Sequence, residues 1–420
     1  MSGKRALLGA AVLLVFSFSP AFAEWESNGG SISPVLTEDG QAQPGDKKLL
    51  PGGEAEDPPV YIPPGDALPQ VTARSAVVMD ALTGEILYQR MMDERRYPAS
   101  TTKIMTLITA LEANKGLDDA VKISGAAADM EGSTMWLEQG ERYRFEDLLY
   151  GLMLVSGNDA ATAVAEHVAG SVSAFAGRMT EKAHEIGATH TRFANSCGLH
   201  DPGHYTTAHD LALIAAYGYK NDTFRKIVST KERRVPLMKP PFVRELENEN
   251  MLLWIYPGAN GVKTGYTDAA GRCVVTAAER DGVQLIAVVL DGAYMWNDSI
   301  AMLDYGFRHI ESREFVKKGE KLASIPVAGG EQDSVPLVAE KTLRLPVPNG
   351  DASAYRREIK APRSLEAPVQ RGEKVGEAVY YYKGQKVASV PLKAESHVGR
   401  ENSFLGGLAR FWHKITSLFA

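Results

Sequence analysis

The sequence predicts an α+β domain with helices around an antiparallel sheet, followed by a small all-β sandwich domain. Helical periodicity fills the stretch between early and late strand-like segments, so the sheet of the first domain must pair strands that lie far apart in sequence. After about residue 312, short β-type runs alternate with turn signals, a pattern typical of a sandwich. A chain of 420 residues is long enough for two or three domains.

The composition is that of an ordinary globular protein, with 44% hydrophobic and 23% charged residues, which excludes a fibre or a wholly disordered chain. The net charge of −6 argues against a nucleic-acid partner, because such a partner requires a broad basic surface. The two cysteines, Cys197 and Cys273, are too few for a disulfide scaffold or a Cys-rich zinc module. They could pair in an oxidising compartment, but free buried cysteine is the favoured interpretation.

Residues 1–23 follow the pattern of a secretory signal peptide. Lys4 and Arg5 precede an apolar run over residues 6–18, and the triplet Ala-Phe-Ala at 21–23 provides small residues for a cleavage site. The run is too short to span a bilayer. We therefore expect cleavage after Ala23 and a protein that works outside the cytoplasm, with an uncleaved anchor as the alternative.

Residues 24–67 are expected to form a disordered acidic linker rich in Pro and Gly. Residues 24–66 hold nine acidic residues and two lysines, a net charge of −7. Such a segment can bury little apolar surface. Residues 67–420 carry 42 basic and 43 acidic residues, so the acidic excess belongs to the linker rather than to the folded part.

Residues 68–311 are expected to form the first folded domain. Strand-like residues 75–80 and 85–89 are joined through Thr83-Gly84, which predicts a hairpin. Apolar residues spaced three and four apart predict a helix over residues 101–113. The further elements predicted are helices over 145–154 and 159–168, with a short break between them, and strands over 261–266, 272–278 and 283–290.

Residues 312–400 are expected to form the β-sandwich domain. Turn signals at Gly329-Gly330, Asn349-Gly350 and Lys383-Gly384 separate its strand-like runs. The predicted strands cover residues 314–316, 322–326, 342–346, 378–382 and 386–391.

Residues 401–420 are expected to form an amphipathic helix that lies in a membrane interface. One face is apolar and aromatic, the other is basic, and residues 402–420 contain no acid. A helix packed on the β domain is the alternative. The apolar face consists of Phe404, Leu408, Phe411, Trp412, Ile415, Leu418 and Phe419.

Three short motifs carry the candidate chemistry, and the first is a serine and a lysine at the predicted start of a helix. Ser100 and Lys103 lie three residues apart, so they share a face of that helix. A serine hydroxyl is a weak nucleophile that needs a base, and a neutral lysine can serve where desolvation and another cation lower its pKa. On its own the motif is a weak signal, because Ser-x-x-Lys also arises by chance.

The other two motifs lie on a predicted loop and a predicted strand. Ser156-Gly157-Asn158 occupies the break between two helices, where a hydroxyl and an amide can relay protons and hold a substrate amide. The alternative is a purely structural role as a helix-capping turn. Lys263-Thr264-Gly265 lies on a strand, where the first two side chains can bind a carboxylate and the glycine lets substrate approach the backbone.

In their order, spacing and placement the three motifs resemble the serine D-alanyl-D-alanine carboxypeptidases, the low-molecular-weight penicillin-binding proteins that are related to serine β-lactamases. The flanking residues match too, over 98–106, 156–161, 197–211 and 261–271. The resemblance covers residues 71–310, and the β domain and the amphipathic tail also fit the layout of that family.

The resemblance implies a hydrolase that removes the terminal D-alanine from peptidoglycan stem pentapeptides through an acyl-enzyme, without a cofactor. Penicillins and other β-lactams are then inhibitors that acylate the same serine. Together with the signal peptide and the tail, it implies a peripheral protein on the extracytoplasmic face of the cytoplasmic membrane, with a role in cell-wall biogenesis and cell shape.

The resemblance also implies a role for each motif residue. Ser100 is the nucleophile and Lys103 its general base, and the backbone N–H groups of Ser100 and Tyr266 form the oxyanion hole. The remaining assignments are Ser156 and Asn158 for proton relay and substrate positioning, and Lys263 and Thr264, followed by Gly265 and Tyr266, for the substrate carboxylate.

Two departures from the family pattern concern substrate binding. Many relatives carry an arginine that helps to bind the substrate carboxylate in the loop after the strand over 283–290, but residues 291–300 contain none. Arg272 is a possible substitute, although side-chain alternation along its strand could turn it away. Cys197 stands where relatives often have His or Thr.

A zinc carboxypeptidase could act on the same peptides. However, His184-Glu185 is followed by His190 rather than by a histidine at position 188, so the zinc-binding pattern His-Glu-x-x-His fails. A second group of histidines could ligate a metal, but histidines in a polar loop are more often structural. The histidines of this second group are His200, His204 and His209.

Two further alternatives share parts of the same site. A serine β-lactamase needs an efficient deacylating base, and no clear Glu-x-x-Asn segment lies in the expected region between the second and third motifs. A catalytically inert, membrane-bound peptidoglycan-binding scaffold would not need Ser100, Lys103 and Lys263, all of which are intact.

Overall fold

The computed structural model describes residues 67–113, 115–238 and 243–401. The predictions for the signal peptide, for the linker up to residue 66 and for the helix from residue 402 onward lie outside these residues. In the described part of the chain, no helix is both long and apolar enough to cross a membrane.

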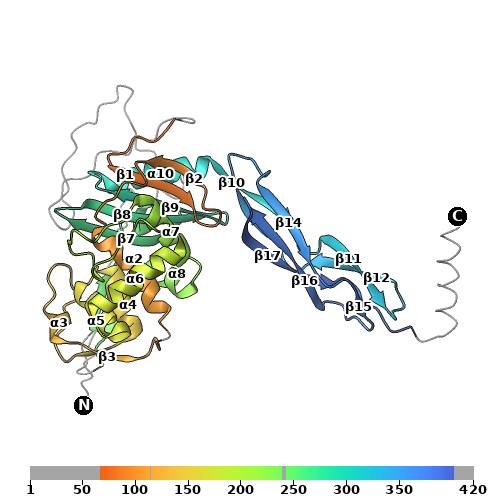
Figure 1. Cartoon of the computed structure of the whole chain (residues 1–420), viewed down its shortest axis with the longest axis horizontal. Helices are drawn as coiled ribbons and strands as arrows, with labels where there is room; N and C mark the ends of the chain where they lie inside the picture. Colours follow the sequence, from red (N-terminus) through yellow and green to blue (C-terminus); the bar gives the residue numbers. More distant parts are fainter. Residues whose placement is uncertain (1–66, 114, 239–242, 402–420) are drawn as a thin grey trace, which may run out of the picture.

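The first domain is built on a five-stranded antiparallel sheet in the order β2-β1-β9-β8-β7 (Figure 1). Ser75 of β1 lies opposite Leu290 of β9, which confirms that the sheet pairs distant segments. The predicted hairpin and the three predicted late strands are also confirmed. The strands are β1 (Ser75–Asp80), β2 (Ile86–Arg90), β7 (Ala259–Thr267), β8 (Gly271–Arg280) and β9 (Val283–Leu290).

Both faces of this sheet are covered by helices, because the pleat sends alternate side chains of each strand to opposite sides. In β8, Cys273 and Val275 join a large core shared with α2 and α4 to α8, whereas Val274 and Ala278 join a second core shared with α10. The helices are α2 (Lys103–Leu111), α4 (Phe145–Leu154), α5 (Asn158–Ala169), α6 (Val172–Ile186), α7 (Ala208–Gly218), α8 (Asp222–Val228) and α10 (Met295–Arg308).

The predicted helices over 145–154 and 159–168 are confirmed as α4 and α5, and the helix predicted over 101–113 is shorter, ending at Leu111. Several short elements were not predicted, because few of their residues are buried and their apolar pattern is weak. They are β3 (Ala120–Lys122), α3 (Gly125–Ala128), β4 (Arg142–Arg144), β5 (Glu232–Pro236), β6 (Val243–Glu247) and α9 (Leu252–Ile255).

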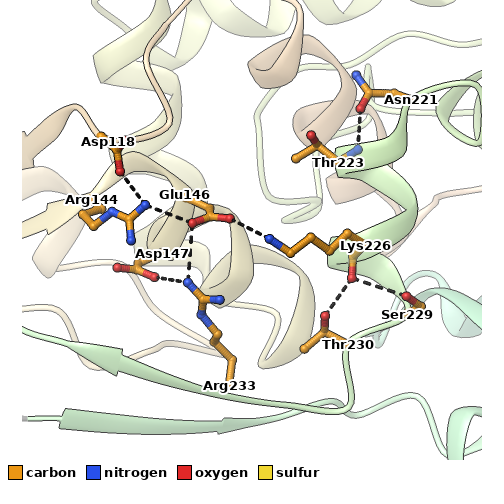
Figure 2. Close-up of polar contacts among 10 residues, drawn as sticks. All are labelled: Asp118, Arg144, Glu146, Asp147, Asn221, Thr223, Lys226, Ser229, Thr230 and Arg233. Carbon is orange, nitrogen blue, oxygen red and sulfur yellow. Dashed lines mark hydrogen bonds and ion pairs between the residues drawn. The ribbon is translucent and has the colours of Figure 1, made fainter.

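A cluster of ion pairs fixes the first turn of α4 against two later elements (Figure 2). Glu146 accepts hydrogen bonds from Arg144 at 3.1 Å and from Lys226 of α8 at 3.4 Å. Arg233 of β5 donates to Asp147 at 2.9 Å and to Glu146 at 3.5 Å. Acidic residues also suit the positive end of a helix. The cluster therefore holds the β5–β6 hairpin and α8 against the helix that leads into the Ser156 loop.

The second domain is all-β, as predicted. A curled six-stranded sheet in the order β14-β16-β17-β12-β11-β15 and a two-stranded sheet of β10 and β13 share one apolar core. Its strands are β10 (Ile310–Val316), β11 (Lys321–Ala328), β12 (Ser334–Ala339), β13 (Leu343–Pro348), β14 (Tyr355–Lys360), β15 (Leu365–Glu366), β16 (Lys374–Tyr382) and β17 (Gln385–Ala394).

Strand β10 connects the two domains directly after α10 (Figure 1). The boundary predicted at residues 311 and 312 falls inside this strand, whose Ile310 already lies opposite Pro348 of β13. A polar contact also joins the domains: Glu85, at the β1–β2 hairpin, accepts hydrogen bonds from Lys383 Nζ at 2.6 Å and from Tyr382 Oη at 3.2 Å.

Candidate active site

Ser100 lies in a single turn of 3-10 helix, Ala99–Thr102, and not in an α-helix. The α-helix α2 begins only at Lys103, which corrects the prediction that Ser100 opens it. Ala99 adopts a φ of +47°, an uncommon conformation for a residue with a side chain, which the surrounding packing must hold in place. Ser100 nevertheless faces Lys103, because Lys103 Nζ lies 2.8 Å from Ser100 Oγ.

The amine of Lys103 is fully buried and lies among uncharged oxygen atoms. Besides Ser100 Oγ, its Nζ contacts Asn158 Oδ1 at 2.8 Å and the backbone oxygen of Cys197 at 2.7 Å. Burial is the main cause that lowers the pKa of Lys103 to about 7, and the positive charge of Lys263 acts in the same direction. Lys103 is therefore partly neutral at neutral pH, as a general base requires.

The second motif lies in the break between α4 and α5, as predicted. Ser156 is buried and has a φ of +58°, while Asn158 is the first residue of α5. Asn158 Nδ2 donates to the backbone oxygen of Glu131 at 2.7 Å, so its amide is oriented with Oδ1 toward Lys103. The helix-capping interpretation fails for Asn158, because Gly157 is the N-cap residue and makes no side-chain cap.

The carboxylate of Asp159 fixes the segment that faces Asn158. Its carboxylate accepts hydrogen bonds from the backbone N–H groups of Met135, at 3.0 and 3.1 Å, and of Leu137, at 3.0 Å. The carboxylate is buried, so these bonds compensate for its desolvation. The segment around Met135 and the start of α5 are thereby held together.

The third motif lies on β7, the edge strand of the sheet, with Lys263 and Thr264 both buried. Lys263 Nζ donates to Thr264 Oγ1 at 3.2 Å, and Thr264 Oγ1 donates to Glu249 Oε2 at 3.0 Å. Burial lowers the pKa of Lys263, and the carboxylate of Glu249, 3.5 Å from its Nζ, opposes that shift. Lys263 is thus a buried amine with a carboxylate beside it.

Two glycines allow the backbones around Ser100 to approach closely. A Cβ atom at Gly265 of β7 would lie 2.7 Å from the backbone nitrogen of Ser100, so only glycine brings this strand against the turn that carries Ser100. Gly198 has a φ of +93°, and a Cβ atom there would overlap the backbone carbonyl group of Ala99. Gly198 follows Cys197, whose carbonyl group is thereby aimed at Lys103.

Tyr266 and Arg272 lie opposite each other in the β7–β8 ladder. Tyr266 is exposed, and its hydroxyl donates to Asp268 at 3.0 Å. The register places Arg272 on the face of the sheet that also carries Thr264 and Tyr266, and not on the face of Lys263. Arg272 therefore shares a sheet face with one member of the candidate carboxylate pair.

The structure joins Ser100, Lys103 and Asn158 by hydrogen bonds and brings Lys263 close enough to influence the pKa of Lys103. Sequence reasoning missed the carbonyl group of Cys197 and the carboxylate of Glu249. Any residue type supplies a carbonyl group, so only the neighbouring Gly198 could have pointed to the first. Nothing in the local sequence around Glu249 indicated that it reaches Lys263.

The histidines considered for metal binding contact other groups; His184 Nε2, for example, lies 3.1 Å from the backbone oxygen of Thr191. His204 is buried, and its Nε2 lies 2.8 Å from Thr102 Oγ1; burial lowers its pKa to about 4. Among the residues that the structure describes, no group of three or more His, Cys, Asp or Glu side chains is arranged to hold a metal ion. Cys197 and Cys273 are both buried and free.

Two family models match this chain. One, described as D-alanyl-D-alanine carboxypeptidase, matches residues 63–293, and the other, described as the C-terminal domain of penicillin-binding protein 5, matches residues 311–400. The second match coincides with the all-β domain.

Curated relatives and solved structures are similar along most of the chain. D-alanyl-D-alanine carboxypeptidase DacF of Bacillus subtilis is 35% identical over 361 residues, which cover 82% of this chain and 90% of the relative. DacC of Escherichia coli is 32% identical over 366 residues, covering 84% and 89%. The crystal structure of penicillin binding protein 5 from Haemophilus influenzae, 31% identical, superimposes with a TM-score of 0.57 and covers 80% of this chain and all of that one.

Proposed function

The chain belongs to the D-alanyl-D-alanine carboxypeptidase family, and we propose that Ser100 carries its acyl-enzyme chemistry with Lys103 as the general base. The protein is a penicillin-binding hydrolase that acts on the D-alanyl-D-alanine end of peptidoglycan stem peptides. One observation supports the assignment most strongly: a fully buried lysine amine lies 2.8 Å from Ser100 Oγ and is otherwise surrounded by carbonyl oxygens.

Acylation requires Lys103 in its neutral form. A neutral amine has two hydrogens and one lone pair. The carbonyl oxygens of Asn158 and Cys197 accept the two hydrogens, which leaves the lone pair for the hydroxyl of Ser100. In the proposed step Nζ takes the hydroxyl proton while Oγ attacks the carbonyl carbon of the penultimate D-alanine. The pKa of about 7 supports this role at neutral pH.

Collapse of the tetrahedral intermediate breaks the bond to the nitrogen of the terminal D-alanine, which must receive a proton. We assign that relay to Ser156, which passes the proton from Lys103 to the leaving amine. Asn158 orients the lysine and holds the substrate amide. In deacylation a water molecule attacks the ester carbon and gives one proton to Lys103. The bond between that carbon and Ser100 Oγ then breaks, and Lys103 returns the proton to Oγ; the released peptide is one D-alanine shorter.

The backbone N–H groups of Ser100 and Tyr266 are the proposed oxyanion hole. The close approach of Gly265 to the nitrogen of Ser100 supports this, because it brings the end of β7 next to the nucleophile turn. Donors fixed in advance stabilise the negative charge that develops on the carbonyl oxygen.

Lys263 and Thr264 are proposed to bind the terminal carboxylate of the substrate. A buried ammonium group beside a hydroxyl suits an anionic ligand, and Arg272 is a further candidate contact from the neighbouring strand.

Mass spectrometry of the protein after incubation with penicillin tests the nucleophile. We expect one covalent adduct, mapped to the peptide that contains Ser100, and neither adduct nor D-alanine release in Ser100→Ala. Ser229→Ala, which changes a partly exposed serine elsewhere, should behave as wild type. An adduct at another residue, or unchanged D-alanine release in Ser100→Ala, would contradict the proposal. Rapid penicillin turnover without a stable adduct would favour a β-lactamase.

We also propose that residues 1–23 are removed on export and that residues 401–420 attach the protein to the extracytoplasmic face of the cytoplasmic membrane. The signal-peptide pattern and the aromatic, acid-free tail support this location. N-terminal sequencing should find Glu24 first, and deletion of residues 402–420 should move the protein to the soluble fraction. A mature protein that starts at Met1, or a deletion variant that stays on the membrane, would contradict it.

A further inference from the structure

The anion site around Lys263 already contains a carboxylate from the protein itself. Glu249 Oε2 accepts a hydrogen bond from Thr264 Oγ1 at 3.0 Å and lies 3.5 Å from Lys263 Nζ. These are the two groups assigned above to the terminal carboxylate of the substrate. Glu249 therefore makes in the free protein the contacts that a carboxylate ligand would make.

The backbone at Glu249 is fixed, so its side chain is the part that can move. The backbone N–H of Glu249 donates to Leu154 at 3.1 Å, and that of Asn248 donates to Lys231 at 2.8 Å. The side chains of Asn248 and Asn250 are buried and make further hydrogen bonds, to the backbone of Thr230 and of Leu252 respectively. The side chain of Glu249 is 43% exposed, so it can turn into water while its backbone stays in place.

We propose that Glu249 is a specificity-determining residue: its carboxylate occupies the anion site in the free enzyme, and the terminal carboxylate of the substrate must displace it. This inference rests on the proposed function, since it takes Lys263 and Thr264 as the carboxylate-binding pair. Thr264 has a single hydroxyl hydrogen and cannot donate it to two carboxylates at once. Two carboxylates at one site also repel each other.

The displacement weakens substrate binding without slowing the bond-breaking steps. Glu249 must leave before the substrate carboxylate is seated, and it stays displaced through the transition state. An effect that is equal in the bound substrate and in the transition state changes KM and leaves kcat alone. A substrate without a terminal charge does not compete for the anion site, so it is not subject to the effect.

Steady-state kinetics of Glu249→Gln with two substrates tests the inference. One is an N-acylated tripeptide that ends in D-alanyl-D-alanine, and the other is the same peptide with a C-terminal amide. We expect KM for the acid to fall about fivefold or more with kcat unchanged within about twofold, and KM for the amide to stay within about twofold. Glu247→Gln, which removes the same charge from an exposed residue two positions away, should change neither.

A change of KM or kcat by the same factor for both substrates would overturn the inference, because it would mean that Glu249 only positions Lys263. An increase in KM for the acid would also overturn it. Release of D-alanine by the wild-type protein and labelling of Ser100 by penicillin separate this failure from that of the proposed function. If the wild-type protein neither releases D-alanine nor is labelled by penicillin, the proposed function and the inference on Glu249 both fail. If it does both, the change in KM for the acid, compared with the change in KM for the amide, tests the inference on Glu249 alone.

Discussion

Two lysine amines are buried in the same site, but their neighbours differ in charge. Lys103 on α2 contacts a hydroxyl and two carbonyl oxygens, all neutral, whereas Lys263 on β7 lies 3.5 Å from the carboxylate of Glu249. Burial lowers the pKa of both. The comparison teaches that burial acts alike on the two amines and that their nearest neighbours distinguish them: a carboxylate favours the charged form of Lys263, whereas Lys103 has only neutral contacts.

The largest effect is expected from removing the amine of Lys103, whose neighbours are all neutral. Lys103→Ala should slow penicillin acylation of Ser100 by about a thousandfold or more, because general-base catalysis contributes factors of this order. Stopped-flow measurement with a fluorescent penicillin gives the rate, and a thermal unfolding scan checks that the variant is folded. Labelling at the wild-type rate would show that another group takes the proton.

A smaller loss should follow when the surroundings of Lys103 are made to resemble those of Lys263. Asn158→Asp places a carboxylate where Asn158 Oδ1 now lies, 2.8 Å from Lys103 Nζ, and so should raise the pKa of the lysine. Acylation at pH 7 should fall about a hundredfold and recover in part near pH 9. Asn221→Asp, at a helix N-cap where either residue serves, is the matched control. A loss that does not recover at high pH would point to damaged geometry instead.

The wild-type protein should show the base directly in its pH profile. Lys103 is active when neutral, and its pKa is lowered to about 7, so the acylation rate should rise with pH and level off above about 8. Between pH 6 and pH 8 the neutral fraction, and hence the rate, should increase by about tenfold. Rate constants for penicillin acylation from pH 5 to 9 provide the measurement, and a flat profile would contradict the assignment.

The smallest effect should come from moving β7, which carries Lys263, away from the turn that carries Ser100. In Gly265→Ala the new Cβ atom would lie 2.7 Å from the backbone nitrogen of Ser100, so β7 must shift away from the turn that carries Ser100. We expect acylation to slow by about tenfold, since a misplaced oxyanion donor lowers the rate. Gly177→Ala, where a Cβ atom meets nothing within 4 Å, is the control. An unchanged rate would show that the contact between strand and turn is not needed.

The sequence predicted which side chains meet at the site better than it predicted their surroundings. Ser100, Lys103 and Asn158 could be named because the order and spacing of three motifs together resemble a known family, and the structure joins these residues. The carbonyl group of Cys197 and the carboxylate of Glu249 could not, since their roles arise only when distant segments meet. The prediction that Ser100 opens an α-helix was also wrong. The φ of +47° at Ala99 cannot be predicted from the residue type, because alanine seldom adopts a positive φ.

The fold shows the same contrast between strong and weak patterns. The buried strands β8 and β9 and the helix α4 match their predicted ranges closely, because apolar side chains dominate them. The strand β14 was missed, because it lies at the edge of its sheet and carries mostly charged residues, as edge strands often do. The helix α6 has an apolar stripe, Phe175, Met179 and Ala183, that could have been recognised from its spacing.

The contact between Gly198 and Ala99 has a consequence for how this enzyme can change over time. Any side chain at position 198 would collide with the carbonyl group of Ala99, the residue before Ser100. A mutation at Gly198, ninety-eight positions further along the chain, can therefore displace Ser100 without changing that residue. Drug-resistant variants that arise under selection with penicillin should retain this glycine, because altering it would sacrifice the native reaction together with the inhibition.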